Sequence, residues 1–398
     1  MTEAVIVDAV RTPLGKGKAG GALSGVHAVD LLAHPLAALV ERNDLDGALV
    51  DDVIVGAVSQ VGEQGVNVAR RGVLAAGFPE RVPATTVDRQ CGSSQQAISF
   101  AAQGVLAGAY DLVIAGGIES MSRVPMGSSA AGTDDLDGER LAARYPDGFV
   151  PQGVAAELIS AKWGLDRGRL DEFGLRSQEL AAAARDAGRF DDEIAPIKVG
   201  DGEGGLTVVS ADEGIRETSL ERLAALRPAF EHPHWTERFP QIRWSVTAGT
   251  SSQLTDGAAA VLVASRERAE QLGLPVRAVV RSTVVEGDDP LYMLTGVIPA
   301  TRKLLHRAGL GIDDIDLFEV NEAFAPVVLA WADETGADLD RVNVHGGAIA
   351  LGHPLGASGT RLATTLISAM EQRGARYGLQ VMCEAGGLAN ATLYELAG

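Results

Sequence analysis

The chain has 398 residues, 46% of them hydrophobic, which is enough material for two or three domains with large buried cores. Its 53 acidic residues outnumber 34 basic ones and give a formal net charge of −19, which argues against nucleic acid and anionic membranes as partners. Two cysteines, Cys91 and Cys383, are too few for a disulfide framework and are typical of reduced thiols in a cytoplasmic protein.

Strand-like and helix-like segments alternate in the first 118 residues. Apolar runs predict strands at 4–10, 53–58, 85–90 and 112–115, and helical periodicity predicts helices at 29–41, 66–76 and 95–109. The last part of the chain repeats this scheme, with strands expected at 258–264, 276–285, 315–320, 342–345, 379–383 and 389–395, and helices at 299–308, 323–331 and 359–372. Such alternation predicts an α/β fold whose sheets carry helices on both faces.

The middle of the chain, residues 119–247, is polar and is interrupted by Gly and Pro, with amphipathic stretches at 154–162 and 170–187. A structureless connection of that length is rare, so we interpret it as an inserted loop domain that forms a lid or a binding region. The sequence thus divides into residues 1–118, 119–247 and 248–398.

The two outer parts show a weak internal duplication. In the first, a strand leads to a turn with Cys91, then to a helix and to a strand that ends at Gly117. In the second, a glycine-rich turn with His353 leads to a helix and to a strand that ends at Cys383. If the two units face each other, these turns meet, and the two cysteines and the histidine share one pocket.

Cys91 stands between a predicted strand and a predicted helix, in a polar, glycine-rich context. Unpaired N–H groups and the positive end of the helix dipole favour a thiolate there, as a nucleophile requires. The alternative is a buried structural cysteine, which is the commoner fate of an isolated cysteine. The polar flanks and the neighbouring motifs favour the nucleophile.

Three further segments carry candidate polar groups, namely 320–326 with Asn321, 346–359 with His353, and 382–387 with Cys383. Each alone is weak, because an Asn at a strand end is usually a cap and a His in a turn is usually satisfied structurally. No G-x-G-x-x-G motif follows the first strand, which disfavours a dinucleotide site. His232 and His234 lack a third metal ligand nearby, and the cysteines form no C-x-x-C redox pair.

Together these segments resemble the thiolases, the acyl-CoA C-acyltransferases. The resemblance covers nearly the whole chain and is carried, in order, by residues 5–13, the Cys91 turn, 116–122, 226–230, 246–249, 256–259, 320–326, 346–359 and 382–387. It implies duplicated βαβαβαββ halves that form a layered α-β-α-β-α core with an inserted loop domain. The N-terminal half would hold the nucleophilic Cys, and the C-terminal half the Asn, the His and the second Cys.

The resemblance also implies catalytic roles. Cys91 would attack the 3-keto carbon of a 3-ketoacyl-CoA, His353 would take its proton, and Cys383 would protonate the departing acetyl-CoA enolate and later deprotonate CoA. One oxyanion site would consist of His353 and a water held by Asn321. The other would consist of the backbone N–H groups of Cys91 and Ala385. The family needs no metal or redox cofactor.

Further residues are implied as CoA and substrate contacts, in the inserted segment and the loop at 246–257. Arginines in this region would supply local positive charge to an otherwise acidic surface, although single arginines are often only solvated helix residues. The implied contacts are Ala248 and Ser252 for the pantetheine, Arg216 and Phe230 towards the nucleotide, and Met293 and Phe324 on the acyl side, with charge from Arg216, Arg222 and Arg227.

Four features depart from the family pattern. Ala385 replaces the first glycine of Cys-x-Gly-Gly-Gly, and a side chain there restricts φ near the oxyanion site. Residues 151–153, Pro-Gln-Gly, replace the His-Met-Gly of many biosynthetic members. His345 replaces an Asn and receives no catalytic role. The longer segment 231–245 brings three aromatic residues, which either cover a bulky substrate or, as we favour, anchor the insertion: Trp235, Phe239 and Trp244.

The sequence therefore predicts a degradative 3-ketoacyl-CoA thiolase, similar to thiolases of actinobacterial lipid and steroid catabolism that act on branched or ring-derived substrates. The alternatives are a biosynthetic acetoacetyl-CoA thiolase and a non-catalytic acyl-CoA-binding relative. A ketoacyl synthase is disfavoured because it would carry a second histidine in place of Cys383. The expected partners are CoA thioesters and further copies of the chain, as a homodimer or a dimer of dimers. No signal peptide or membrane span is evident.

Overall fold

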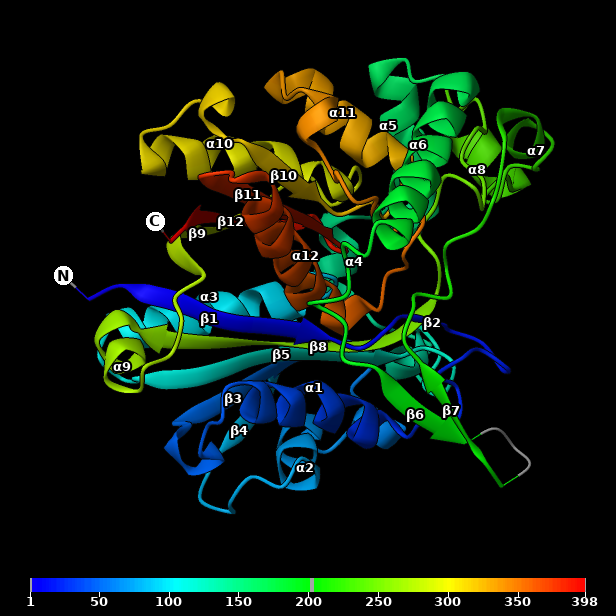
Figure 1. The fold of residues 1–398 in the computed structure, drawn as a ribbon. Helices are drawn as coiled ribbons and strands as arrows, with labels where there is room; N and C mark the ends of the chain where they lie inside the picture. The colour runs from blue at the N-terminus through cyan, green and yellow to red at the C-terminus, as the bar shows by residue number, and fades with distance from the viewer. Residues whose placement is uncertain (1, 201–203, 398) are drawn as a thin grey trace.

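The computed structural model describes residues 2–200 and 204–397. A first set of strands forms the lower sheet of Figure 1, in which β8 lies between β1 and β5 and pairs antiparallel with both, while β3 and β4 continue the sheet in parallel. The strands are β1 (Ala4–Arg11), β3 (Asp52–Gly56), β4 (Ala84–Val87), β5 (Leu112–Ser120) and β8 (Thr255–Ser265), with the short β2 (Gly15–Lys16) beside β8.

A second set forms the upper sheet, with β10 parallel to β11, and β11, β12 and β9 antiparallel in turn. These strands are β9 (Ala278–Gly287), β10 (Leu317–Val320), β11 (Tyr377–Glu384) and β12 (Leu388–Leu396). The two sheets are connected through two residue pairs of β1 and β9, Val5 with Val279 and Ile6 with Ala278.

Helices form three layers around the sheets (Figure 1). The middle layer contains α3 (Ser93–Leu106) and α12 (Ser358–Arg373), which contact each other and both sheets. The outer layers contain α1 (Ala28–Arg42) and α2 (Val68–Ala75) below, and α10 (Val297–Ala308) and α11 (Ala325–Thr335) above. The predicted α-β-α-β-α order is therefore confirmed. Strands β5 and β8 are buried along their whole length, as expected for a sheet covered on both faces.

The internal duplication extends to individual hydrogen bonds. Asp51 Oδ2 accepts from the backbone N–H groups of Asp111 and Leu112 at the start of β5. Asp316 Oδ2 accepts in the same way from Arg376 and Tyr377 at the start of β11. These bonds make β5 the counterpart of β11 and α3 the counterpart of α12. The ends of β5 and β11, and the turns before the two helices, are therefore equivalent places in the two halves.

One predicted strand, 342–345, is wrong. The counterpart of β4 in the upper sheet is reduced to a single bridge between Phe318 and Val342, because Asn343 has a φ of 48°. Its side chain replaces the missing ladder: Oδ1 accepts from Val320 N at 2.8 Å, and Nδ2 donates to Val320 O at 2.9 Å. The amide copies the backbone pairing of a strand that the left-handed residue interrupts.

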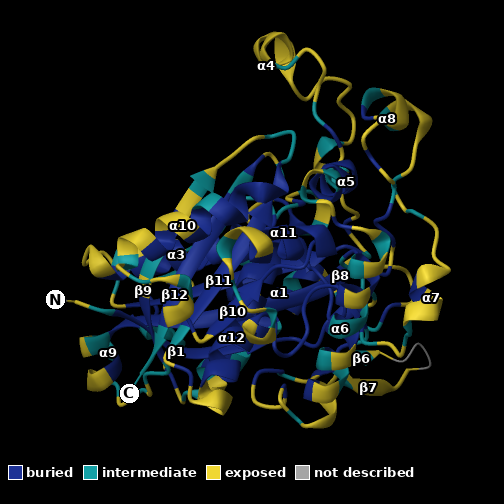
Figure 2. Cartoon of the chain, turned by 90° about the horizontal axis from the view of Figure 1, so that it is seen from above, coloured by how far each residue is buried: buried dark blue, intermediate teal, exposed yellow. Residues whose placement is uncertain are grey.

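The inserted segment leaves the lower sheet after β5 and returns at β8, and these two strands are neighbours. It contains α5 (Gln152–Trp163), which packs on α11, and α6 (Arg167–Asp186). Figure 2 shows α4, α7 and α8 as exposed elements at the rim. The remaining elements are α4 (Gly138–Arg144), the hairpin β6 (Ile197–Gly200) and β7 (Leu206–Val209), α7 (Leu220–Ala224) and α8 (Pro233–Arg238), with α9 (Arg266–Gln271) following β8. The division at residues 118 and 247 stays a prediction.

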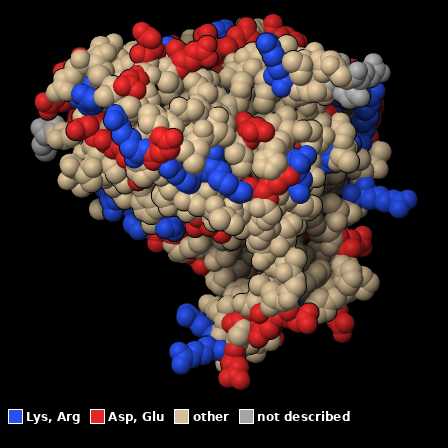
Figure 3. All heavy atoms as spheres, turned by 90° about the horizontal axis from the view of Figure 1, so that it is seen from below, with Lys and Arg blue, Asp and Glu red and all other residues tan. Residues whose placement is uncertain are grey.

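The surface has no single acidic patch on the face that Figure 3 shows, where acidic and basic side chains are interspersed.

Among the described residues, no helix combines the length and the apolar character needed to cross a bilayer.

The side-chain ladder at Asn343 gives a test of the fold. Asn343→Ala removes its bonds to Val320 and leaves the paired groups buried without partners, so we expect a loss of about 3 kcal/mol in the free energy of unfolding. Chemical denaturation measures it. Asn67→Ala is the matched control, because Asn67 also has a positive φ but is exposed, so water can replace its bonds to Arg70 N, Ala84 O and Thr86 Oγ1. This variant should lose about 1 kcal/mol. Equal losses for both variants would contradict this account.

Candidate active site

Cys91 lies in the tight turn between β4 and α3. Gln90 before it has a φ of 49°, and Gly92 after it is the N-cap of α3. A Cβ at position 92 would collide with the carboxyl of Glu384, so a larger residue there would displace this side chain. The turn therefore places Cys91 next to the end of β11, and the residue is 4% exposed.

The N-termini of α3 and α12 are in direct contact. Ser94 Oγ accepts from Thr360 N at 3.0 Å, and a Cβ at Gly359 would collide with the backbone of Gln95. The turn that precedes α12 also passes close to β5, where a Cβ at Gly117 would strike the carbonyl of Gly356. These close approaches require small residues and bring the turns of Cys91 and His353 to one place. They also explain why β5 continues through two glycines to Ser120.

His353 is held in one tautomer. Ser358 Oγ donates to the Pro354 carbonyl at 2.9 Å, so it must accept from His353 Nδ1, which lies 2.5 Å away. The lone pair is then on Nε2, which lies 3.5 Å from Asn321 Nδ2. Burial, assisted by the positive charge of Arg361, lowers the pKa of His353 from 6.5 to about 3. The imidazole is therefore neutral near pH 7 and can accept a proton on Nε2.

Cys383 and Asn321 lie at the ends of two adjacent parallel strands, β11 and β10, and Asn321 N donates to Val381 O at 3.0 Å. Burial and the nearby Glu384 raise the pKa of Cys383 to about 12, against hydrogen bonds from Asn321 and from the backbone N–H groups of Cys383 and Ala323. Within the described residues, Asn321 Oδ1 has no hydrogen-bond partner. A buried amide oxygen of this kind suits a water or a substrate atom.

The expected thiolate at Cys91 is wrong for the resting enzyme. Burial raises the pKa of this thiol, and Cys383 and Glu384 add to the increase, so the thiol stays protonated at neutral pH. The backbone N–H groups of Ala385 and Cys91 point at the sulfur and oppose the shift. Desolvation outweighs the helix terminus, and the thiol needs a base to become a nucleophile.

A cavity of about 380 Å³ opens onto His353. Phe230, Ser252 and Phe324 line it together with residues 151–153, and so do apolar residues that we did not single out from the sequence as contacts: Met121, Met126, Leu254 and Leu355. The cysteines and Asn321 are buried and do not belong to this lining. Apolar side chains from distant loops gave no signal in the sequence. Ser358, which orients the imidazole, could have been predicted, because it is the hydroxyl closest to His353 in the glycine-rich segment.

The other suggested contacts do not line this cavity. Arg216 and Ala248 are exposed, and Arg222 and Arg227 are exposed on the same inserted segment. Met293 is buried in the hydrophobic cluster that also contains Phe324 and Cys383.

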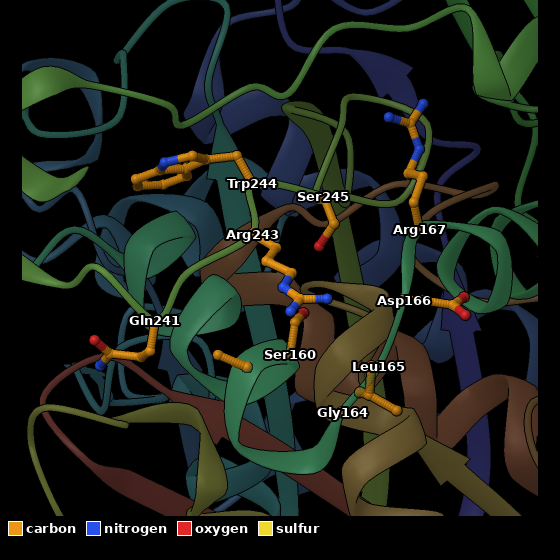
Figure 4. A pocket seen from close by; sticks show the side chains of 10 residues that line it. Ser160, Gly164, Leu165, Asp166, Arg167, Gln241, Arg243, Trp244 and Ser245 are labelled. Carbon is orange, nitrogen blue, oxygen red and sulfur yellow. The ribbon is translucent and has the colours of Figure 1, made fainter.

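The aromatic residues of 231–245 anchor the insertion. Phe239 is buried in the upper core, Trp235 stacks on it with ring centroids 6.3 Å apart, and Trp244 Nε1 donates to Thr236 Oγ1 at 3.0 Å. Trp244 lines a different cavity, of about 480 Å³, between α5, the start of α6 and residues 241–245 (Figure 4). His232 caps α8. In the described part of the chain, no group of three or more His, Cys, Asp or Glu side chains is arranged to hold a metal ion.

A neutral imidazole lines the cavity and is linked through Asn321 to Cys383, which interacts with Cys91. On a duplicated α/β fold, this is the arrangement of a thiol-dependent acyltransferase. Family models for the N-terminal and C-terminal domains of thiolase match residues 4–267 and 274–396. The chain therefore belongs to the thiolase family.

Individual relatives agree over the full length. The chain is 47% identical to the steroid 3-ketoacyl-CoA thiolase FadA6 of Mycobacterium tuberculosis, over 99% of this chain and 94% of that protein. It is 46% identical to a 3-ketoacyl-CoA thiolase of Aliivibrio fischeri, over 99% of this chain and 100% of that protein. The crystal structure of the Bacillus anthracis acetyl-CoA acetyltransferase superimposes with a TM-score of 0.89 at 37% identity, covering 100% of this chain and 99% of that one.

His345 is 5% exposed, with its ring edge-on to Phe190. Burial, with Arg373 and Arg189 nearby, lowers its pKa from 6.5 to about 4. The unfolded chain therefore binds the extra proton first as the pH falls below 6.5, and stability is lost between about pH 6.5 and pH 4. Denaturation at pH 7 and pH 5 should show this loss, reduced in His345→Gln by up to about 1.4 kcal/mol per pH unit. An unchanged slope in the variant would contradict the assignment.

Proposed function

We propose that this thiolase cleaves 3-ketoacyl-CoA with CoA to give acetyl-CoA and a shortened acyl-CoA. The observation that carries the proposal is the convergence of Cys91, Cys383 and the unprotonated Nε2 of His353 at one buried site. The names of the relatives from Mycobacterium tuberculosis and Aliivibrio fischeri support the reaction and the direction of degradation.

Acylation begins at Cys91. The substrate enters the cavity, and His353 Nε2 removes the thiol proton as sulfur attacks the 3-keto carbon. Because the thiol is protonated and the imidazole neutral, the transfer occurs only when a substrate is present to take up the negative charge. The C2–C3 bond then breaks, leaving the acyl group on Cys91.

Cys383 protonates the departing enolate carbon. A thiol whose pKa is raised by burial to about 12 retains its proton until a strongly basic carbanion forms. In the second half-reaction the thiolate of Cys383 removes the proton of incoming CoA, and the CoA sulfur takes the acyl group from Cys91. Cys91 leaves as a thiolate and takes back its proton from His353 Nε2, which restores the resting site.

Two oxyanion sites stabilise the charge. The N–H groups of Cys91 and Ala385 face the Cys91 sulfur, where the tetrahedral oxyanion on the acyl carbon develops. His353 and a water on Asn321 Oδ1 serve the enolate oxygen. Ala385 keeps its N–H in place of the usual glycine, so the replacement preserves the donor.

The cavity sets the substrate class. Its lining is mainly apolar, with Met121, Phe324 and Leu355 close to His353, which fits a hydrophobic acyl group. We assign branched or ring-derived 3-ketoacyl-CoA as preferred substrates, because the M. tuberculosis relative is named a steroid thiolase. Ala248 and Ser252 hold the pantetheine, Phe230 and Arg216 lie towards the nucleotide, and Met293 supports Phe324 on the acyl side. Arg222 and Arg227 add positive charge.

A biosynthetic acetoacetyl-CoA thiolase is the second candidate, since the B. anthracis structure bears the name of an acetyltransferase. The Pro-Gln-Gly sequence at 151–153 lines the cavity and favours larger acyl groups. A non-catalytic relative is disfavoured because Cys91, Asn321, His353 and Cys383 are all present.

The reaction needs no metal or redox cofactor, because thiols, an imidazole and N–H donors perform every step. We place the enzyme in the cytoplasm as a homodimer or a dimer of dimers, with CoA thioesters as its small-molecule partners.

A panel of straight, branched and ring-bearing 3-ketoacyl-CoAs tests the proposal by CoA-dependent loss of the 3-keto thioester. We expect turnover of chains longer than acetoacetyl-CoA, and Cys91→Ala should lower it about a thousandfold or more while CoA still binds. Cleavage of acetoacetyl-CoA alone would favour the biosynthetic reaction, and turnover by Cys91→Ala would rule out the acyl-cysteine.

Asn321→Ala tests the oxyanion site formed by His353 and the water on Asn321. Loss of the residue that positions this donor should raise the barrier by about 3 kcal/mol and lower kcat about a hundredfold, with a smaller change in KM. Asn43→Ala, at the end of α1 and outside the cavity lining, is the control and should leave kcat unaltered. A change in KM alone would show that Asn321 only binds substrate.

A further inference from the structure

Glu384 follows Cys383 in β11. Its side chain points to the opposite face of the strand, towards the turn of Cys91, and is fully buried. It occupies the space that a Cβ at Gly92 would need. Glu384 Oε2 has no hydrogen-bond partner among the described residues, and no lysine or arginine there forms an ion pair with it.

The duplicated half contains a natural comparison. Glu119 is the eighth residue of β5, as Glu384 is the eighth residue of β11. It accepts from four donors: Val58 N at 3.0 Å, Ser59 N at 3.1 Å, Gln64 Nε2 at 2.7 Å and Gly356 N at 2.9 Å. Gly356, in the turn before α12, is the counterpart of Cys91. The bond that Glu119 takes from Gly356 N is thus missing at Glu384, and the N–H of Cys91 faces its own sulfur instead.

The amides beside Glu384 indicate its protonation state. One atom of the Asn390 amide lies 2.9 Å from Glu384 Oε1, and the other lies 3.3 Å from Gln96 Oε1. With Asn390 Nδ2 donating to Gln96, its oxygen faces Glu384, and two acceptors would be in contact unless the carboxyl carries a proton. Reversing the Asn390 amide lets its nitrogen donate to Glu384 Oε1 and its oxygen accept from Gln96 N at 3.3 Å, but Glu384 Oε2 then still lies buried without a donor from the residues described, which disfavours an anion. A protonated Glu384 donates to the Asn390 oxygen without this reversal.

We propose that Glu384 is a positioning residue which acts as a neutral carboxylic acid, donates to Asn390, and so leaves the Cys91 N–H free for the oxyanion. This inference rests on the proposed function for its role in catalysis. An ionised carboxylate in the same place would compete for that N–H, as Glu119 does for Gly356, and would repel the developing oxyanion.

The charges around Glu384 agree with this assignment. Burial raises its pKa from 4.5 to about 9; Asp88 acts in the same direction, and Arg89 and a hydrogen bond from Asn390 oppose the shift. The two thiols, Cys91 and Cys383, carry no charge at rest, and the other neighbours named above, on α3 and β12, are amides. Arg89 forms no ion pair within the described chain that would fix an anion here.

A stability measurement tests the protonation state without using activity. Between pH 4.5 and about pH 9 the folded protein keeps the Glu384 proton, whereas the unfolded chain releases it. The free energy of unfolding therefore falls as the pH rises through this window. Glu384→Gln has no proton to release and should lose less stability between about pH 5 and about pH 8. Parallel slopes for the wild type and the variant would overturn the proposal, whether or not 3-ketoacyl-CoA is cleaved.

Kinetics test the positioning role. Glu384→Ala should lower kcat about tenfold with little change in KM, because the turn of Cys91 loses its support. Glu384→Gln, which still donates to Asn390, should recover most of this loss near pH 7 and should extend activity above pH 9. The matched control is Glu119→Gln, which turns an amide nitrogen towards N–H donors and should destabilise the fold. A folded Glu384→Gln as impaired as Glu384→Ala would overturn the proposal. If Glu384→Ala does not fold, the comparison of Glu384→Gln with the wild type decides it.

Discussion

The close contact between the N-termini of α3 and α12 is the constraint on which the rest of the structure depends. Each helix begins at a tight turn, one with Cys91 and the other with His353. The helices touch because Gly359 has no side chain where Gln95 approaches, Gly92 leaves room for Glu384 of β11, and Gly117 of β5 leaves room for the turn of His353. Neither half contains the full set of reactive groups. The site exists only where the two halves of the duplication pack against each other across the shared helical layer (Figure 1).

Burial at this contact sets the chemistry. It keeps both thiols protonated and the imidazole neutral, so the resting site holds no thiolate that could react with other electrophiles. Charge appears only when a substrate carbonyl can receive it, and N–H groups are already oriented towards that position. The pair Glu119 and Glu384 shows how the two halves have diverged. Glu119 accepts from the N–H of Gly356 in the turn before α12, whereas Glu384 leaves the equivalent N–H, that of Cys91, available.

Much of this fold could be predicted from the sequence, because hydrophobic periodicity locates the helices and most strands, and the motifs around Cys91, Asn321, His353 and Cys383 identify the site. The interruption of the strand expected at 342–345 could not be predicted, since a left-handed Asn343 and its side-chain ladder leave no mark in the pattern of hydrophobic residues. The sequence predicted a lowered pKa for the Cys91 thiol, whereas burial raises it. The helix terminus beside Cys91 can be read from the local sequence, but the desolvation comes from both halves of the fold and cannot. Cavity residues such as Met126 and Leu254 come from distant loops and carry no motif.

The most direct test of the division of labour between the two sulfurs is the site of acylation. After incubation with acetyl-CoA and rapid acid quenching, mass spectrometry of the proteolysed enzyme should find the acetyl group on the peptide that contains Cys91 and an unmodified peptide for Cys383. An acetyl group on Cys383, or on neither cysteine in an enzyme that turns over, would contradict the account.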